Sequence, residues 1–274
     1  MVLVSVQEGG AAMWSWACLV PHPPIAVPEV GRGREKEASK TLEGFRALAR
    51  ALEEEQPDVL VVLSPHQPYA PGVLFVCGER FEGDLASFGA PQVQLEACGA
   101  VDETEEILGI LRNVPVHRVD RDTATLDHAS LVPLWFLSRS WRSLPRLVVA
   151  NPVGLELSEA LALGRELRSL TGEGTWGLMA SGDLSHRLIP GAPAGYSPSG
   201  RVFDDAVLRS LETSSSEPLE RLSPDVLEEA GECGLRSVLT LLGFVGGDPI
   251  KTLSYEGPFG VGYATALWTP PQEA

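Results

Sequence analysis

The stretch DVLVVLSPHQPY, residues 58–69, contains an unbroken apolar run, Val59 to Leu63, followed by a histidine in a proline-rich segment. Residues 34–55, just before it, carry apolar side chains at helical spacing. A short apolar run after a helix is typical of a strand buried on both faces of a parallel or mixed sheet. The stretch therefore predicts an α/β fold, with His66 just beyond the end of a central strand.

The rest of the chain continues this alternation of helical and strand patterns, and no linker or internal repeat interrupts it. We expect strands at 14–20, 58–64, 73–77, 146–150, 174–181 and 260–268, and helices at 34–55, 103–111, 130–138, 156–170, 199–212 and 224–242. Alternating elements of this kind build a layered α/β domain. The sequence predicts one domain over residues 1–274, with its core at about 14–268 and a mostly parallel or mixed central sheet flanked by helices.

The composition excludes several classes of protein. The chain has 274 residues, 44% of them hydrophobic, and a net charge of −16. Such a chain can fill a core, and its charge repels nucleic acid and anionic membranes. The four cysteines lack the CxxC spacing, the first ten residues do not resemble a signal peptide, and no apolar run reaches the roughly 20 residues that span a bilayer. We expect a cytoplasmic protein.

Histidines follow three of the apolar strands: His22, His66 and His186. Ligands of open α/β sheets bind at the carboxyl ends of the strands, so these side chains could converge on one point. Prolines stiffen the segments around His22 and His66, which helps to keep a metal ligand aimed. Two histidines and one carboxylate on one face are typical of a non-haem Fe(II) site. His117, in polar sequence, is expected at the surface or in a loop.

The missing carboxylate has one candidate, Glu232, at the start of an apolar helix and beside Cys233. A glutamate there could equally serve the helix alone, because a negative charge near a helix N-terminus is favourable. The residues by themselves leave both interpretations open.

Four segments together resemble the class III, or LigB-type, extradiol ring-cleavage dioxygenases: PHPPIAVPEVG, LSPHQPY, LDHASLVPL and SGDLSH. Memo-like proteins share the fold of that superfamily. The resemblance covers the chain from Cys18 to about Trp268 and rests on the order and spacing of the segments. It implies a LigB-like α/β fold and a non-haem Fe(II) enzyme that cleaves a catechol-type ring, a dihydroxyphenyl compound or an aminophenol, with O2.

The resemblance also implies roles for individual residues. His22 and His66 correspond to the first two iron ligands, and Glu232 to the third. His186 corresponds to the active-site base, and His128 to a histidine that contacts the substrate or bound oxygen. His128 and His186 are thus the expected catalytic residues.

Alternatives remain at the third ligand. In Memo-like proteins a cysteine followed by glycine takes that place, and Cys233 fits this pattern as well as Glu232 fits the other. The second function is therefore a Memo-like metal-binding or interaction protein without ring cleavage, and the third is a zinc hydrolase using the same histidines. We expect Fe(II), or Zn or another divalent metal as purified. We also expect a small aromatic substrate with O2 and a homo-oligomer. A small partner subunit, as in some two-subunit relatives, stays open.

Overall fold

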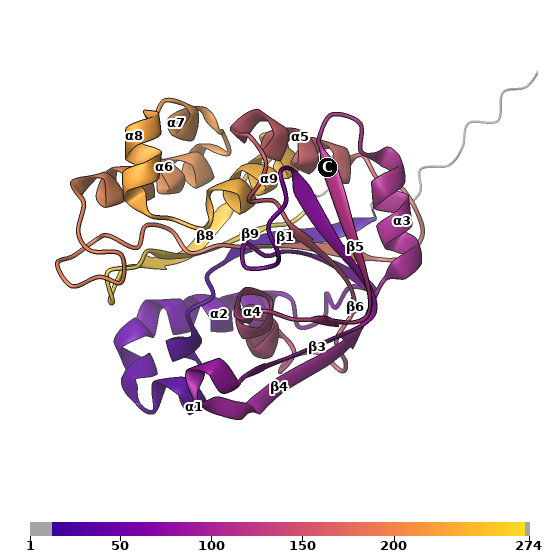
Figure 1. Cartoon of the computed structure of the whole chain (residues 1–274), viewed down its shortest axis with the longest axis horizontal. Helices are drawn as coiled ribbons and strands as arrows, with labels where there is room; N and C mark the ends of the chain where they lie inside the picture. The colour runs from indigo at the N-terminus through magenta and orange to yellow at the C-terminus, as the bar shows by residue number, and fades with distance from the viewer. Residues whose placement is uncertain (1–12, 272–274) are drawn as a thin grey trace, which may run out of the picture.

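The structure, a computed structural model, describes residues 13–271 as a nine-stranded mixed sheet with helices on both faces (Figure 1). The strands are β1 (Trp14–Val20), β2 (Val59–Leu63), β3 (Val73–Leu85), β4 (Ala90–Cys98), β5 (Val116–Thr125), β6 (Arg146–Asn151), β7 (Trp176–Ser181), β8 (Lys251–Glu256) and β9 (Tyr263–Trp268). The α-helices are α1 (Pro28–Gly31), α2 (Ser39–Ala51), α3 (Val101–Ile110), α4 (His128–Leu137), α5 (Leu157–Arg168), α6 (Pro198–Thr213), α7 (Glu217–Glu220), α8 (Pro224–Ala230) and α9 (Leu235–Val245). Short 3₁₀ turns are η1 (Pro24–Ala26), η2 (Arg34–Ala38) and η3 (Ala86–Phe88).

The strand order is β4-β3-β6-β2-β7-β1-β9-β8, with β5 paired to β3 outside this path. The centre is parallel: β2 pairs with β6 and β7, and β7 pairs with β1. Antiparallel strands extend this parallel centre on both sides. On one side β3 pairs antiparallel with β6, and on the other β9 pairs antiparallel with β1. The carboxyl ends of β1, β2 and β7 therefore meet at one edge of the sheet.

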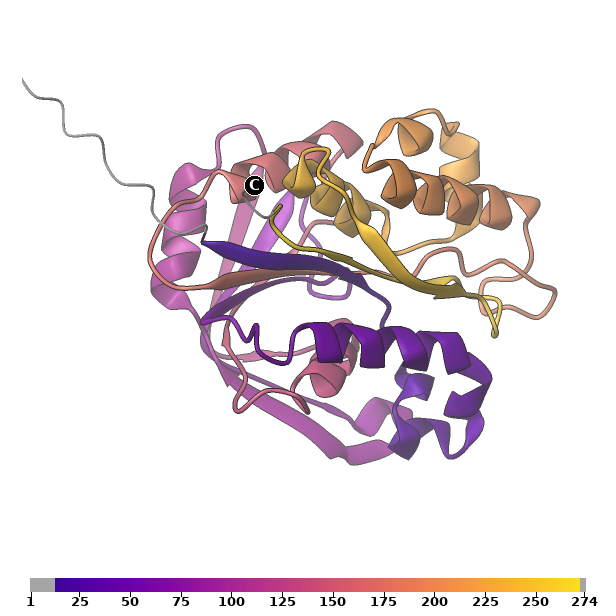
Figure 2. The same ribbon diagram turned by 180° about the vertical axis from the view of Figure 1, so that it is seen from behind.

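The sheet separates two apolar cores, and β2 contributes to both. Leu60 and Val62 pack toward α2 and α4, whereas Val59, Val61 and Leu63 pack toward α5 and α9. Figure 2, from behind, shows α2 lying along one face of the sheet, with α5, α6 and α9 on the other. Burial on both faces is the reason why β2 needs an unbroken apolar sequence.

The predicted α/β fold with a mixed sheet is confirmed, and β1 has the predicted bounds. Three strands, β4, β5 and β8, were not predicted. The single helix expected over 224–242 is wrong, because the chain breaks between α8 and α9. Gly231 adopts a left-handed conformation there, with φ of 60°. A Cβ on Gly182 would come within 2.4 Å of the Gly234 Cα, so the break is packed closely against the segment after β7.

One prediction from the sequence concerns residues that the structure does not describe. Residues 1–12 and 272–274 lie outside the described part, and with them the first ten residues, for which no signal peptide was expected. Within residues 13–271, none of the helices combines the length and apolarity required to cross a bilayer.

Candidate metal centre

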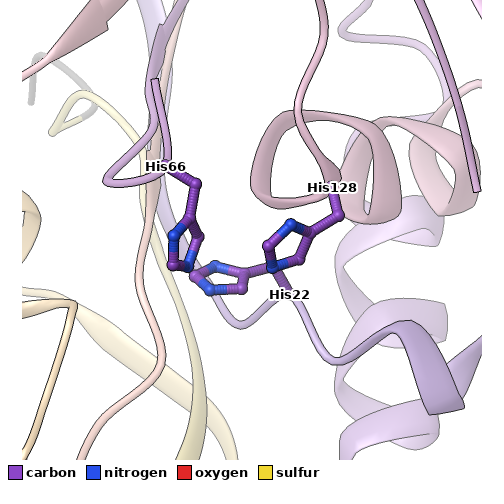
Figure 3. A group of neighbouring side chains, drawn as sticks. All are labelled: His22, His66 and His128. Atoms are coloured by element: carbon purple, nitrogen blue, oxygen red, sulfur yellow. The ribbon is translucent and has the colours of Figure 1, made fainter. Parts of the chain in front are cut away.

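Three histidines gather at the carboxyl edge of the sheet: His22, His66 and His128 (Figure 3). Each offers a ring nitrogen, and the three nitrogens lie within 4.8 Å of one another. The rings of His66 and His128 stack with centroids 4.5 Å apart, and the His22 ring is nearly perpendicular to both. Imidazole nitrogens converging on one point are the donor set of a transition-metal site.

The sheet explains why two of these histidines meet. Val20, the last residue of β1, lies opposite Ser181 of β7, and Leu63, the last residue of β2, lies opposite Ala180. Parallel neighbours end together, so the segments carrying His22 and His66 leave the sheet at the same edge, on either side of β7. His128 comes from elsewhere, as the first residue of α4.

His22 is 1% exposed, and its hydrogen bonds define its tautomer. The Ser181 hydroxyl donates to the backbone carbonyl of Ala129 at 2.7 Å, which uses its only hydrogen. The contact between His22 Nδ1 and Ser181 Oγ, 2.9 Å, therefore has Nδ1–H as the donor. Nε2 is therefore the unprotonated nitrogen of the neutral ring, and it lies 3.6 Å from Cys233 Sγ and 3.7 Å from Asp183 Oδ2. The His22 backbone N–H donates to Asp183 Oδ1 at 2.8 Å, which fixes the loop itself.

Asp127 joins the loops of the other two histidines. Its carboxylate accepts hydrogen bonds from the Ser64 hydroxyl at 2.7 Å and from Gln67 Nε2 at 2.6 Å, on either side of His66. It also accepts from the Ser130 backbone N–H at 2.9 Å, which caps the first turn of α4 beside His128. One side chain thus determines the position of two histidines from distant parts of the sequence.

The electrostatics keep these imidazoles neutral. Burial lowers the pKa of His22 well below its usual range, and the neighbouring His66 and His128 lower it further. Burial, with a smaller effect of His66, lowers the pKa of His128 to about 4. The pKa of His66 is lowered by burial, and Asp127 partly offsets this. Neutral rings can bind a metal without first losing a proton.

His186 follows β7, as predicted, and is half-buried. Its Nδ1–H donates to the backbone carbonyl of Leu184 at 3.0 Å. Burial lowers its pKa, hydrogen bonds to the backbone of Leu184 and Gly231 raise it, and the charge of His66 lowers it. His186 is not one of the three histidines whose ring nitrogens converge, and its role as the base stays a prediction.

The two candidates for the third ligand differ in position. The Glu232 carboxylate accepts the Leu235 backbone N–H at 2.6 Å and lies 3.9 Å from Arg236, so it serves the start of α9. Cys233 Sγ lies 3.6 Å from His22 Nε2. Burial and the nearby Asp183 raise the pKa of this thiol. The structure thus brings Cys233 beside His22 and ties Glu232 to the first residue of α9, while the role of either residue as a metal ligand stays a prediction.

A cleft of about 640 Å³ opens beside His128, between β3, β4 and η3. The Phe88 ring forms one wall, with its centroid 5.2 Å from that of His128. Glu82, Asp84 and Glu96 also line the cleft. The cleft is large enough for a small aromatic molecule and borders the three-histidine group through His128.

Sequence reasoning missed the residues that hold the histidines. Asp127, Ser181 and Asp183 all lie inside the segments LDHASLVPL and SGDLSH, in which only the histidines were assigned roles. Asp183 is 5% exposed, and burial raises its pKa to about 7. The available signal was the placement of polar residues beside each histidine.

Comparisons with known proteins bear on this site. The model of the family described as the catalytic LigB subunit of aromatic ring-opening dioxygenase matches residues 16–266. The Clostridium acetobutylicum protein CA_C1420 is 34% identical over 262 residues, which cover 89% of this chain but 55% of that protein, so the chain spans about half the length of this relative. The crystal structure of an uncharacterized Escherichia coli K12 protein has a TM-score of 0.61 at 17% identity, covering 92% of this chain and 99% of that one, and shows a shared fold.

Proposed function

This chain belongs to the LigB family of aromatic ring-opening dioxygenase catalytic subunits, and on that premise we propose that it is a non-haem Fe(II)-dependent extradiol dioxygenase. Its substrate would be a catechol-type aromatic, a dihydroxyphenyl compound or an aminophenol, cleaved with O2. The family match supports the reaction class, and the arrangement of residues supports the metal dependence.

The observation that carries the proposal is the convergence of three neutral imidazoles within 4.8 Å. Imidazole nitrogen suits iron, zinc, copper and nickel, so the donors fit Fe(II) without selecting it. In this proposal His22, His66 and His128 hold the metal, with His22 binding through Nε2. When bound, iron supplies Lewis acidity toward a phenolic oxygen and electron exchange with O2.

The protein's own groups handle the proton. His186 keeps a hydrogen on Nδ1, because that atom donates to the Leu184 carbonyl. Its lowered pKa leaves Nε2 unprotonated near neutral pH, so Nε2 can accept a phenolic proton as a general base. The cleft beside His128 offers a place for the aromatic ring, with Phe88 as an apolar wall. The sequence-based role of His128, contact with substrate or oxygen, stays an alternative to metal binding.

One observation favours the second function, a Memo-like metal-binding or interaction protein. Cys233 Sγ lies 3.6 Å from His22 Nε2, while the Glu232 carboxylate is bound to the Leu235 N–H. This is the cysteine-containing arrangement that the resemblance implies for Memo-like proteins. A metal site with three histidines and a thiol would not need to cleave a ring.

The test is anaerobic loading of the metal-free protein with Fe(II), followed by O2 uptake with a panel of catechols and aminophenols. We expect O2 consumption together with a yellow ring-fission product for at least one compound. His66→Ala should abolish both, whereas His117→Ala should not, because the His117 ring is exposed and contacts the Pro71 carbonyl. Stoichiometric Fe(II) binding without O2 uptake across the panel would favour the Memo-like function.

A further inference from the structure

Asp204 of α6 is a fully buried carboxylate that the proposed chemistry does not use. Its Oδ1 accepts a hydrogen bond from the Ser185 backbone N–H at 2.8 Å, and its Oδ2 accepts one from the Tyr255 hydroxyl at 2.7 Å. Among residues 13–271 it forms no ion pair, since nearby Arg201 pairs with Asp205. A buried carboxylate without a cation is costly, so its presence calls for a purpose other than stability.

Ser185 links two segments of the candidate site. Its hydroxyl donates to the Ala230 carbonyl at 2.8 Å and accepts the Arg187 backbone N–H at 3.0 Å. The His186 backbone N–H reaches the same Ala230 carbonyl at 3.3 Å. The loop that carries His186 and the turn that leads into Cys233 are therefore one hydrogen-bonded unit, with Ser185 at its centre.

The surroundings hold the Asp204 carboxylate in one place. The Gly262 backbone N–H donates to the Ser185 carbonyl at 2.8 Å, and a Cβ on Gly262 would lie 2.0 Å from Asp204 Oδ2. Tyr255 belongs to β8 and pairs with Ala264 of β9. Ser185 is thus fixed from a helix and from the edge of the sheet at once.

We propose that Asp204 and Tyr255 are positioning residues: they fix Ser185 and so align His186 and Cys233 with the three-histidine group. The inference rests on the proposed function only in treating His186 as the base. Neither residue touches the metal-binding nitrogens, and the loops of His22, His66 and His128 have their own supports in Ser181 and Asp127. Loss of Asp204 should therefore disturb His186 and Cys233 more than metal binding.

The experiment compares Asp204→Leu, Asp204→Asn and Tyr255→Phe, with Asp205→Leu as the matched control on the exposed side of the same helix. All carry Cys98→Ser, because Cys98 is exposed whereas Cys18 and Cys77 are buried. Three quantities are measured well below the unfolding temperature. They are the alkylation rate of Cys233 in the metal-free protein, the affinity for zinc, and turnover of the best compound from the panel.

We expect Asp204→Leu to speed Cys233 alkylation about tenfold and to slow turnover about 10–100-fold, with zinc affinity within about threefold of the parent protein. Asp204→Asn should restore parent behaviour, because its amide oxygen still accepts from Ser185. Tyr255→Phe should show the same changes at smaller size, and Asp205→Leu should show none.

An unchanged alkylation rate in Asp204→Leu, or a loss of zinc affinity as large as the loss of turnover, would overturn the proposal. If Asp204→Leu does not fold, Tyr255→Phe decides by the same alkylation readout, and an unchanged rate there refutes the idea. If the parent protein turns over no compound, the proposed function fails separately. The alkylation and zinc measurements then still decide about Asp204.

Discussion

The Ser64 hydroxyl donates a hydrogen bond to the Asp127 carboxylate at 2.7 Å across 63 residues of sequence. Ser64 follows β2 two residues before His66, and Asp127 precedes His128, so this bond joins two of the three segments that form the candidate metal centre. The pair acts as a support for the imidazoles and supplies no metal ligand itself. Supports of this kind determine how well a metal site is aligned.

Asp127→Ala should weaken metal binding by about 10–100-fold, because Ser64, Gln67 and the first turn of α4 all lose their common acceptor. Equilibrium dialysis with zinc measures this directly. Asp122→Ala, at an exposed position of β5, is the control for removal of a negative charge. Equal affinities in the two variants would show that Asp127 does not position the histidines.

Alanine substitution of His22, His66 or His128 should remove most of the bound metal and leave the fold intact. Each contributes one of the three nitrogens that lie within 4.8 Å of one another. Metal content after loading, measured alongside circular dichroism, tests the prediction, and His117→Ala serves as the matched histidine control. Full metal content in the His22 and His66 variants would refute the site.

Cys233→Ala should leave metal affinity within about threefold of the parent protein, because in the proposed function the three histidines hold the metal. A loss of about tenfold or more would favour the Memo-like function, in which the thiol 3.6 Å from His22 Nε2 is a ligand. Glu232→Ala should lower the stability of the protein by about 1 kcal/mol, because the Leu235 backbone N–H loses its hydrogen-bond acceptor at the start of α9. Cobalt titration monitors the affinity, and its thiolate absorption band reports on the cysteine. Metal binding weakened in Glu232→Ala by about tenfold or more would return Glu232 to the metal, as the resemblance to the dioxygenases predicts.

His186→Ala should retain the metal and lose turnover by about 10²–10⁴-fold, the usual contribution of a general base. His186→Gln should be nearly as slow, because an amide preserves size and hydrogen bonding but cannot accept the proton. Steady-state O2 uptake with matched metal content separates this from a binding defect. Near-parental rates in both variants would remove His186 from the chemistry.

The buried Asp204 carboxyl group should make the free energy of unfolding fall as the pH rises. Burial raises its pKa from 3.8 to about 6, so the folded protein holds a proton that the unfolded chain has already lost in this interval. The favourable contribution is complete below pH 3.8 and is lost as the pH rises through 6. Relative to the parent protein, Asp204→Asn should therefore gain up to about 3 kcal/mol between pH 4 and pH 8.

Urea unfolding at the two pH values measures this gain, and Asp205→Asn controls for the loss of a surface charge. A difference between Asp204→Asn and the parent protein that does not change with pH would contradict the buried, ionised state of Asp204.

The sequence predicted the parts of the fold that are buried on both faces. β2 is an unbroken apolar run and β1 is interrupted only by Ser15, which is the pattern expected of strands buried on both faces. β5 was missed because its residues, VHRVDRDTAT, are mostly exposed and pair only with β3, so they lack both an apolar run and a clear alternation. Its omission also hid the fact that His128, like His22 and His66, follows a strand.

The sequence indicated which types of residue would form the site, but it did not determine the role of each residue. Histidines after strands indicated the location, whereas the choice between Glu232 and Cys233 depends on a one-residue difference at the start of a helix. Gly231 and Gly234 break the expected helix there, and the backbone of Gly234 packs on Gly182. Adjacent residues then point in different directions, which no periodic pattern in the sequence reveals.

The position of β7 between β2 and β1 has a consequence for how the protein is made on the ribosome. Ser181, at its end, lies 159 residues after His22, whose ring it orients. At about 5–20 residues per second, the segment between His128 and Ser181 takes about 3–10 s to synthesise. During that time all three imidazoles have been synthesised, but the strand that belongs between two of them has not. A metal ion captured by the growing chain would meet histidines in the wrong arrangement, so productive metal loading belongs to the completed polypeptide.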